Sequence, residues 1–307
     1  MRSAGQRHTQ SGGSVFNGLG RTLLNALFPV RCAGCEQFRS PPRTMAEVLE
    51  RAAALLNGVP PSEAIGPTAD GGVQAQVPNA ARSVLANWFC PACRESFTWI
   101  SSPHCTLCGR MFPSRTGRDH PCAACTRTPP PYDRARACGV YGGSLKAAIQ
   151  KLKYRGQIQW ADPLGLLLYL SAWDYGFLKN CSVILPVPLH PSRLRRRGFN
   201  QVYLMLRQWP AYARWLDPTS RLPAVDPWLL RRRQPTIPQT GLAPQERRAN
   251  VSGAFQIEDP QGIIKGRQIL LVDDVFTTGA TAGACVQALK SKGRAGGVDV
   301  LTLAGSS

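Results

Sequence analysis

Gln268-Ile-Leu-Leu-Val-Asp-Asp-Val-Phe-Thr-Thr-Gly-Ala-Thr-Ala-Gly-Ala284 is the stretch of sequence that decides the fold. It begins with four aliphatic residues at 269–272, and a short aliphatic run of this kind is typical of a buried strand in a parallel sheet. Two adjacent acids, Asp273 and Asp274, stand where that strand should end. Small residues and hydroxyls follow around one glycine, and residues 282–290 then have good helix composition. The stretch therefore predicts a strand, an acid pair, a tight turn and a helix.

This order of elements suits a phosphorylated sugar. A tight turn into a helix presents free backbone N–H groups, and the helix dipole favours an anion there. Gly279 allows close approach of the backbone, and the hydroxyls of Thr277, Thr278 and Thr281 add donors. The two carboxylates accept hydrogen bonds when ionised and suit a pair of ribose hydroxyls. The alternative is an unrelated strand, turn and helix whose acids are solvated caps.

Length and composition indicate two domains and an anionic partner. The chain has 307 residues, 43% of them hydrophobic, and a formal net charge of +19. Phosphates, nucleic acid and an acidic protein all fit that charge. The N-terminal residues lack the apolar segment of a signal peptide, and the best apolar run, 164–170, is too short to span a bilayer. We therefore expect a cytoplasmic protein.

Eight of the eleven cysteines form four CxxC pairs, a pattern that predicts metal binding. The predicted ligands are Cys32, Cys35, Cys90, Cys93, Cys105, Cys108, Cys122 and Cys125. Eight thiolates suit two structural zinc ions, with iron–sulfur clusters as the alternative. Sequential and crossed pairing both satisfy the chemistry, and His104 or His120 could replace a cysteine. The other three cysteines, Cys138, Cys181 and Cys285, read as buried core thiols.

The rest of the chain reads as a tail, a Cys-rich module and an α/β domain. We expect a tail and short helix at 1–31, a Cys-rich double zinc ribbon at 32–131 and an α/β domain at 132–307. The ribbon contains an insertion at about 37–87, in which Thr44 and Glu47 predict the cap of a helix through residue 56, and residues 58–79 read as a flexible loop.

The second domain alternates strands and helices, which predicts an α/β fold with a parallel sheet. The expected strands are 136–141, 182–187, 269–272 and 298–303, and the expected helices are 144–154, capped by Ser144, 193–209 and 281–290. Residues 210–226 contain three prolines and read as a loop.

Two arginine-rich stretches carry further chemistry. Arg193, Arg195, Arg196 and Arg197 follow a strand, and the arginine fork binds phosphate oxygens well, so they are candidates for a pyrophosphate. A solvated basic helix start is the alternative. Residues 230–250 are basic and broken by prolines, and they read either as a mobile lid or as a disordered surface loop.

The stretch from 268 to 284 resembles the signature of type I phosphoribosyltransferases that bind 5-phosphoribosyl-1-pyrophosphate (PRPP). The whole chain resembles the ComF/GntX family, in which a double zinc ribbon precedes a phosphoribosyltransferase-like domain. The other motifs that carry this resemblance are the four CxxC pairs, Tyr141-Gly-Gly-Ser-Leu-Lys146, Lys151-Leu-Lys-Tyr-Arg-Gly156, Pro186-Val-Pro-Leu189, Arg197-Gly-Phe-Asn-Gln201, Arg231 through Gln234, Thr236, Gln239, Arg247, Asn250-Val251 and Ala254-Phe255. The insertion at 37–87 departs from the family pattern.

The resemblance implies transfer of a phosphoribosyl group with release of pyrophosphate, linked to DNA uptake in natural competence. Asp273 and Asp274 would be the catalytic acids, and Mg2+ would bind with PRPP. The 5-phosphate would lie on the turn formed by Thr277, Thr278, Gly279, Ala280 and Thr281.

The alternative is a competence factor that binds single-stranded DNA and uses PRPP as a regulatory ligand. Its stacking candidates are Trp88, Phe89, Phe97 and Trp99, which could equally form the core of the ribbon. Competence-machinery proteins are further expected partners. The phosphoribosyl acceptor, the role of the insertion and the oligomeric state stay open.

Overall fold

The computed structural model describes residues 31–39, 44–57, 79–114, 116–219, 221–233 and 253–306. Three expected segments lie wholly or mostly outside the described residues: the N-terminal tail and helix, the loop at 58–78, and the lid expected at 230–250, whose first residues form a strand instead.

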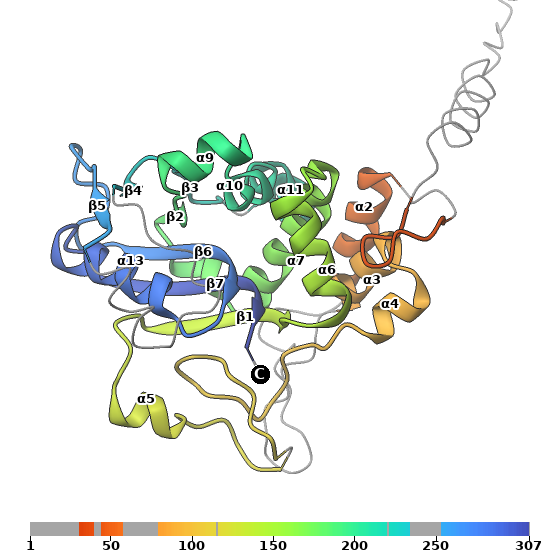
Figure 1. Ribbon diagram of the computed structural model, residues 1–307, viewed down its shortest axis with the longest axis horizontal. Helices are drawn as coiled ribbons and strands as arrows, with labels where there is room; N and C mark the ends of the chain where they lie inside the picture. The colour runs from red at the N-terminus through yellow and green to blue at the C-terminus, as the bar shows by residue number, and fades with distance from the viewer. Residues whose placement is uncertain are drawn as a thin grey trace, which may run out of the picture.

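A parallel sheet of five strands forms the centre of the molecule, in the order β1-β7-β6-β2-β3 (Figure 1). The strands are β1 (Arg134–Val140), β2 (Val183–Pro186), β3 (Ala224–Val225), β6 (Gln268–Phe276) and β7 (Gly297–Gly305). The expected α/β fold is confirmed, and the aliphatic strand of the deciding stretch occupies the middle position. The strand β6 runs on to Phe276, so that Asp273 and Asp274 lie within the strand, near its carboxyl end. Asp273 pairs with Thr302 of β7.

Both faces of the sheet are covered, because alternate residues of each buried strand point to opposite sides. Leu270 and Val272 of β6 face a cluster built on α7 (Ala161–Asp174). Ile269 and Leu271 face a second cluster built on α13 (Ala280–Ser291). The sheet with helices on both sides makes three layers.

The other helices of this part are α6 (Gly143–Tyr154), η1 (Ile158–Trp160), α8 (Phe177–Asn180), α9 (Pro191–Arg197), α10 (Gln201–Leu206) and α11 (Trp209–Leu216). A two-stranded antiparallel ribbon joins β4 (Leu230–Arg232) to β5 (Phe255–Ile257).

Four details differ from the sequence-based expectation. The helix expected at 193–209 is interrupted at Gly198, which has φ of 82° and ends α9. The loop expected at 210–226 contains α11, because Pro210 falls in the first helical turn, where its missing N–H is harmless. Ser144 does not cap α6. Gly142 is the N-cap, and Ser144 lies buried in the first turn. The helix α7 was not expected, because its residues are apolar on every side.

The N-terminal described part consists of short helices around two cysteine groups. They are α2 (Met45–Asn57), α3 (Asn79–Trp88), α4 (Pro91–Glu95) and α5 (Ala123–Arg127). The predicted cap of α2 is confirmed: the Thr44 N–H donates to Glu47 Oε2 at 2.6 Å, and the Glu47 N–H donates to Thr44 Oγ1 at 3.2 Å. The expectation of a loop reaching residue 79 is wrong at its end, where α3 begins.

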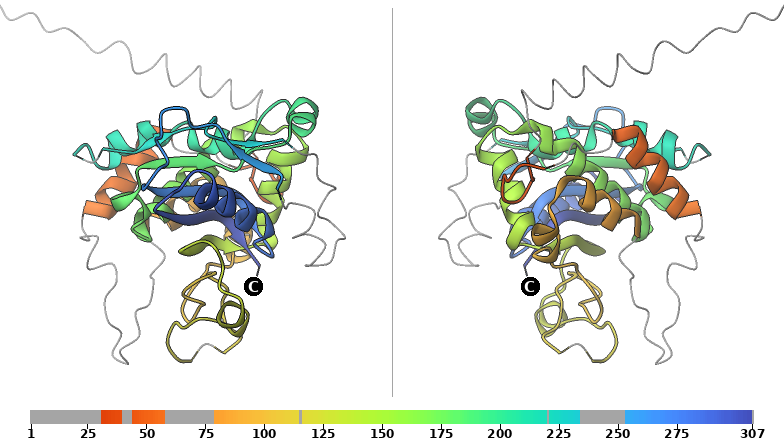
Figure 2. Two further views of the ribbon diagram at one scale, coloured as in Figure 1. Left: turned by 90° about the vertical axis from the view of Figure 1, so that its left-hand side faces the viewer. Right: turned by 90° about the vertical axis from the view of Figure 1, so that its right-hand side faces the viewer.

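The segments that carry the two cysteine groups lie at different sides of the sheet domain. The first group flanks the helices α2 and α3, which separate its two CxxC pairs in the sequence. The pair α2 and α3 packs against α7 and α11 and shares their hydrophobic cluster. The segment that carries α5 projects away from the sheet beyond β1 (Figures 1 and 2). Within the described part of the chain, no helix is both long and apolar enough to cross a membrane.

Candidate functional site

A small pocket lies at the carboxyl end of the central strand, where β6 turns into α13. The space in it that is open to a water-sized molecule is about 20 Å³. Its lining residues are Asp273, Val275, Phe276, Thr277, Gly279, Ala280, Thr281, Ala282 and Thr302. The structure therefore brings together one acid and most of the turn residues that the sequence predicts.

Glycine is required at the point where the helix begins. Gly279 is the N-cap of α13 and has φ of 72°, a left-handed conformation that favours glycine. A Cβ atom at this position would lie 2.7 Å from the ring of Phe276. The turn therefore packs directly on the Phe276 ring. The backbone N–H groups of the first turn of the twelve-residue helix α13, which have no partner within the helix, lie beside the pocket.

The two acids have different surroundings, because neighbouring residues of a strand point to opposite faces. Asp274 is 4% exposed, and the rest of the protein binds both of its oxygens. Lys153 Nζ lies 2.7 Å from Asp274 Oδ1, and Gln201 Nε2 donates to Asp274 Oδ2 at 2.6 Å. Asp273 lines the pocket instead, and its Oδ1 accepts the N–H of Asp274 at 2.8 Å. The carboxylate offered to a ligand is that of Asp273.

The proximity of the acids changes their electrostatics. Burial raises the pKa of Asp273 to about 7, the negative charge of Asp274 adds to the rise, and Lys153 opposes it. Burial alone would lower the pKa of Lys153, but the Asp274 carboxylate outweighs burial and raises it. Lys153 and Asp274 thus form a buried ion pair, while Asp273 is poised to gain or lose a proton near neutral pH.

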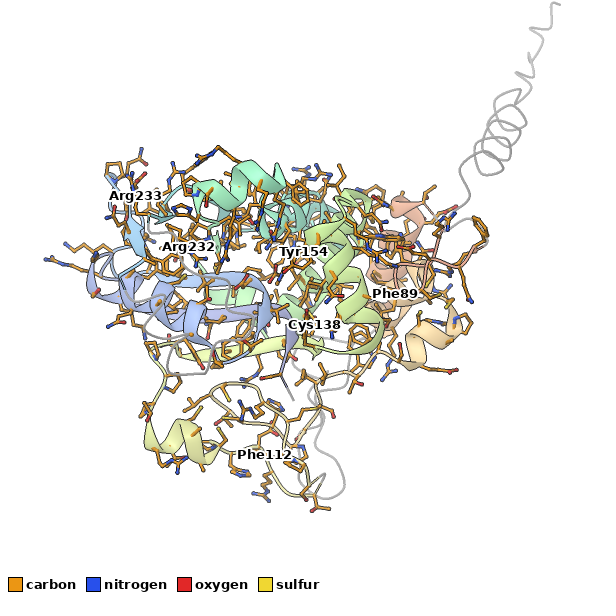
Figure 3. The ribbon with its side chains drawn as sticks, in the orientation of Figure 1. Phe89, Phe112, Cys138, Tyr154, Arg232 and Arg233 are labelled. Carbon is orange, nitrogen blue, oxygen red and sulfur yellow. The ribbon has the colours of Figure 1, made fainter. Side chains whose placement is uncertain are left out.

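The four predicted arginines of α9 divide into two kinds. Arg195 and Arg196 are exposed, whereas Arg193 and Arg197 are half-buried. Arg197 Nη1 donates to Gln201 Oε1, and its guanidinium lies 5.4 Å from the ring centre of Tyr154, which Figure 3 labels. Arg197 is therefore linked through Gln201 to Asp274.

Arg232 of β4 is a site residue that the sequence analysis did not select. It is 6% exposed, and its guanidinium lies 5.4 Å from the ring centre of Phe255. Burial and then the positive charge of Arg193 lower its pKa, and the negative charge of Asp273 acts in the opposite direction. Its neighbour Arg233 is exposed instead (Figure 3).

Lys153, Gln201 and Arg232 had one signal in the sequence. Each falls in a motif that carried the family resemblance, but a motif alone assigns no partner to a residue. Their contacts with the acid pair depend on how distant segments of the chain pack.

The eight cysteines of the CxxC pairs form two groups of four. Cys32, Cys35, Cys90 and Cys93 make the first group, and Cys105, Cys108, Cys122 and Cys125 make the second. The sulfur atoms of each group lie within 4.8 Å of one another. Sequential pairing is thus the arrangement adopted, and neither His104 nor His120 belongs to a group. Four thiols so close fit a tetrahedral zinc ion.

One thiol in each group is prepared for ionisation. Burial alone would raise the pKa of Cys32 and Cys105, but hydrogen bonds from backbone N–H groups lower it to about 6 in both. The N–H of Cys90 donates to Cys32 Sγ at 3.2 Å, and that of Cys122 donates to Cys105 Sγ at 3.3 Å. The two groups are built alike, and thiolates are what zinc binds.

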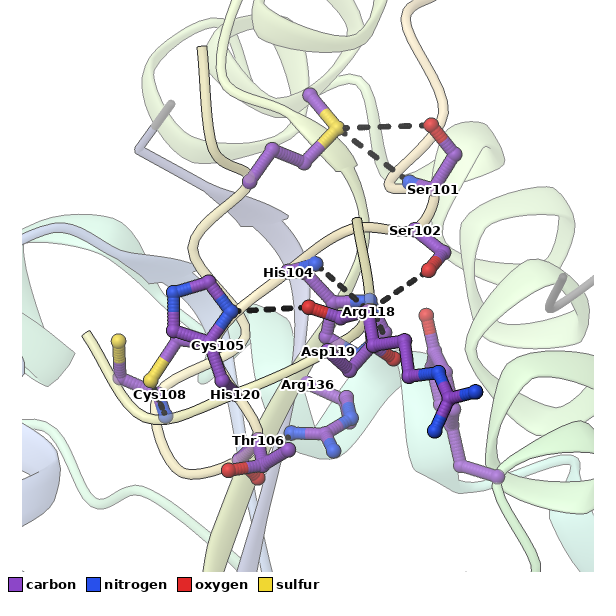
Figure 4. A network of polar contacts seen from close by, with 12 residues as sticks. Ser101, Ser102, His104, Cys105, Thr106, Cys108, Arg118, Asp119, His120 and Arg136 are labelled. Atoms are coloured by element: carbon purple, nitrogen blue, oxygen red, sulfur yellow. Dashed lines mark hydrogen bonds and ion pairs between the residues drawn. The ribbon is translucent and has the colours of Figure 1, made fainter. Parts of the chain in front are cut away.

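The histidines beside the second group make contacts of their own (Figure 4). His104 Nδ1 lies 3.4 Å from Asp119 Oδ2, and the His104 N–H donates to Asp119 Oδ1 at 2.8 Å. His120 Nδ1 is 2.9 Å from the carbonyl oxygen of Arg118. Arg136 of β1 donates to the carbonyl of Thr106 at 3.0 Å and joins this group to the sheet.

Comparison with known proteins places the chain in a family. No family model matches the chain. Competence protein F of Haemophilus influenzae is 33% identical over 214 residues, covering 68% of this chain and 87% of that protein. DNA utilization protein YhgH of Escherichia coli K12 is 32% identical over 215 residues, covering 69% and 88%. Competence protein ComFC of Bacillus subtilis is 25% identical over 220 residues, covering 70% and 82%. With its central parallel sheet and two groups of four cysteines, the chain belongs to the ComF family.

Proposed function

We propose that this protein binds PRPP at the β6–α13 loop and transfers its phosphoribosyl group with release of pyrophosphate. The observation that carries the proposal is the pocket at the end of the central strand, where a left-handed glycine begins a helix beside an acid and three threonines. Ligands of open α/β sheets bind at this end of the strands.

The residues have distinct roles in this mechanism. The 5-phosphate lies on the first N–H groups of α13, helped by the hydroxyls of Thr277 and Thr281. Asp273, when ionised, accepts hydrogen bonds from the ribose hydroxyls. Asp274 does not contact the substrate. Its contacts with Lys153 and Gln201 fix the backbone of β6 and so position Asp273.

Breaking the bond between the anomeric carbon and pyrophosphate leaves positive charge on that carbon and negative charge on the leaving group. The carboxylate of Asp273 stabilises the former, and the half-buried guanidinium groups of Arg193 and Arg197, with the buried one of Arg232, stabilise the latter. The nucleophilic atom of the acceptor then forms the new bond to the anomeric carbon and releases its proton to water. Mg2+ bound together with PRPP would neutralise charge on the phosphate oxygens. Zinc held by the two cysteine groups would supply folding energy.

We assign this activity to DNA uptake in the cytoplasm. Relatives are named competence protein F, competence protein ComFC and DNA utilization protein YhgH, and the first covers two thirds of this chain. The net charge of +19 favours an anionic polymer as a further partner.

A second candidate function is binding of single-stranded DNA with PRPP as a regulatory ligand. An open groove lined by Arg82, Pro91, Arg94, Glu95, Phe97 and Trp99 favours it. The guanidinium of Arg82 lies 5.8 Å from the ring centre of Trp99. Sites that stack single-stranded bases often combine an aromatic ring with an arginine in this way. Of the four predicted stacking residues, Trp88, Phe89 and Phe97 are at most 9% exposed, which leaves Trp99 as the one open to a base.

Calorimetric titration with PRPP and Mg2+ tests the first candidate. Wild type should bind, and Asp273→Asn should lose binding with zinc content unchanged. Glu50→Gln, which removes an exposed carboxylate on α2, is the control and should bind as wild type. Wild-type affinity in Asp273→Asn would remove that carboxylate from the site. Pyrophosphate release should appear once bases, amines or DNA are offered as acceptors, and none from any of them would refute transfer.

A salt titration with single-stranded DNA tests the second candidate. Binding through phosphates should weaken steeply as salt rises. Trp99→Ala should weaken it further, whereas Trp215→Ala, which removes a half-exposed ring from α11, should not. Equal effects of the two variants would take the groove out of the DNA site.

A further inference from the structure

The helix α6 connects the first cysteine group to the acid pair. Lys151 on this helix is 6% exposed, although it carries a charge. Its Nζ donates to the carbonyl oxygens of Ala33 at 3.1 Å and Gly34 at 2.7 Å, and lies 3.3 Å from Glu36 Oε1. Those two carbonyls belong to the turn between Cys32 and Cys35, so the first CxxC turn supplies the partners of a buried cation.

The second CxxC turn of the same group holds the start of α6. Ser144 Oγ donates to the carbonyl oxygen of Cys93 at 2.6 Å, and the Ser144 N–H donates to Ser96 Oγ at 3.3 Å. The packing leaves little freedom, because a Cβ atom on Gly34 would lie 2.5 Å from Cys93 Sγ and 3.0 Å from Ser144 Cβ. Both turns of the first group therefore fix α6.

The last turn of α6 reaches the acid pair through Asp274. Lys153, two residues after Lys151, points to another side of the helix and pairs with Asp274 at 2.7 Å. A helix transmits displacement along its axis because its hydrogen bonds make it stiff. The position of the first cysteine group thus sets the position of Lys153.

We propose that metal binding at the first cysteine group and ligand binding at the β6–α13 loop are thermodynamically linked through α6, with Lys151 as the positioning residue. The loop's ligand rests on the proposed function. Four thiolates around zinc hold the two CxxC turns in one shape. When the metal leaves, the carbonyls that surround Lys151 are no longer held together, and burying that cation becomes unfavourable. The helix then relaxes, and Asp274 loses a fixed partner.

The second cysteine group occupies a different position. Its Leu107 carbonyl accepts the N–H of Ala135 in β1 at 2.7 Å, and Cys108 packs against the hydrophobic cluster that contains Tyr132. Tyr132 meets Phe276 edge-on at 5.9 Å, an apolar contact on the other side of the loop from Asp274. Loss of this group's metal should therefore leave the Lys153–Asp274 pair in place.

Hydrogen–deuterium exchange of the zinc-loaded full chain tests the link without any ligand. Lys151→Met keeps the apolar stem and removes the donors. We expect peptides covering the end of α6 and residues 273–281 to exchange about tenfold faster, within the usual range of coupling between sites. Lys146→Met removes an exposed charge from the same helix and should leave them unchanged. Wild-type exchange at 273–281 in Lys151→Met, or an equal rise in the core strand β7, would overturn the link.

Titration with PRPP and Mg2+ provides the second arm. Cys35→Ser, which removes a ligand of the first group, and Lys151→Met should each weaken PRPP binding about tenfold. The double variant should be no weaker than either, because both act through the same helix, and Lys146→Met should bind as wild type. Effects that multiply in the double variant would show two independent causes. If wild type itself fails to bind PRPP, the proposed function falls, and the exchange experiment alone decides the link.

Discussion

Removing the Lys153 charge should destabilise the protein strongly, because it would leave Asp274 buried without its ionic partner. The side chains are 16% and 6% exposed, and their charged atoms lie 2.7 Å apart. Breaking such a buried pair from one side costs about 3–5 kcal/mol. For a domain of this size that corresponds to a fall in Tm of about 6–20 °C in Lys153→Met.

The assay is urea and thermal unfolding of the zinc-loaded protein, followed by circular dichroism. Lys146→Met is the matched control, and its exposed charge should matter by less than about 0.5 kcal/mol. Adding Asp274→Leu to Lys153→Met should recover most of the loss, because two apolar side chains replace the pair. A loss below about 0.5 kcal/mol in Lys153→Met, or a double variant whose losses simply add, would refute the buried-pair interpretation.

Three further predictions concern the loop and the cysteines. Asp273 has a pKa raised to about 7 by burial and by the Asp274 charge, so the folded protein keeps a proton that the unfolded chain releases near pH 4. Its contribution to stability therefore falls as pH rises from about 4 to 7, and Asp273→Asn should remove that fall when urea unfolding is compared at pH 5 and pH 8. Gly279→Ala should cost about 1–3 kcal/mol in thermal unfolding and weaken PRPP binding. Gly198 has a similar φ, but a Cβ atom there would meet no other atom. Gly198→Ala should therefore destabilise the protein less, and the difference between the two variants measures the clash with the Phe276 ring. Cys105→Ser should lose about one zinc per chain by elemental analysis and lower stability, and full zinc content would exclude Cys105 as a ligand.

The central part of the fold was predictable because its signals are local. The aliphatic run at 269–272 and the turn after it specify β6, the loop and α13 within a few residues. The cap formed by Thr44 and Glu47 likewise places α2 correctly. The helix α7 gave no such signal, since a helix buried on all sides has no polar face to reveal its period.

The site was predictable only in part, because its key contacts join distant segments. Spacing brought both acids to the strand end, but the alternation of a strand that continues past them separates Asp274 from Asp273. Its partners Lys153 and Gln201 come from α6 and α10, and no local pattern connects those helices. The pairing of the CxxC turns was open for the same reason.

The separation of the CxxC turns has a consequence for the order of assembly. Cys35 and Cys90 are 55 residues apart, whereas Cys108 and Cys122 are 14 apart. Closing the longer span costs about 1.2 kcal/mol more chain entropy. The second cysteine group, with the shorter span, should therefore bind its metal ion first. Cys32 and Cys35 should remain unliganded thiols until Cys90 and Cys93 come close to them. The packing of α2 against α3 should favour that second closure, because it brings the two ends of the long span towards each other.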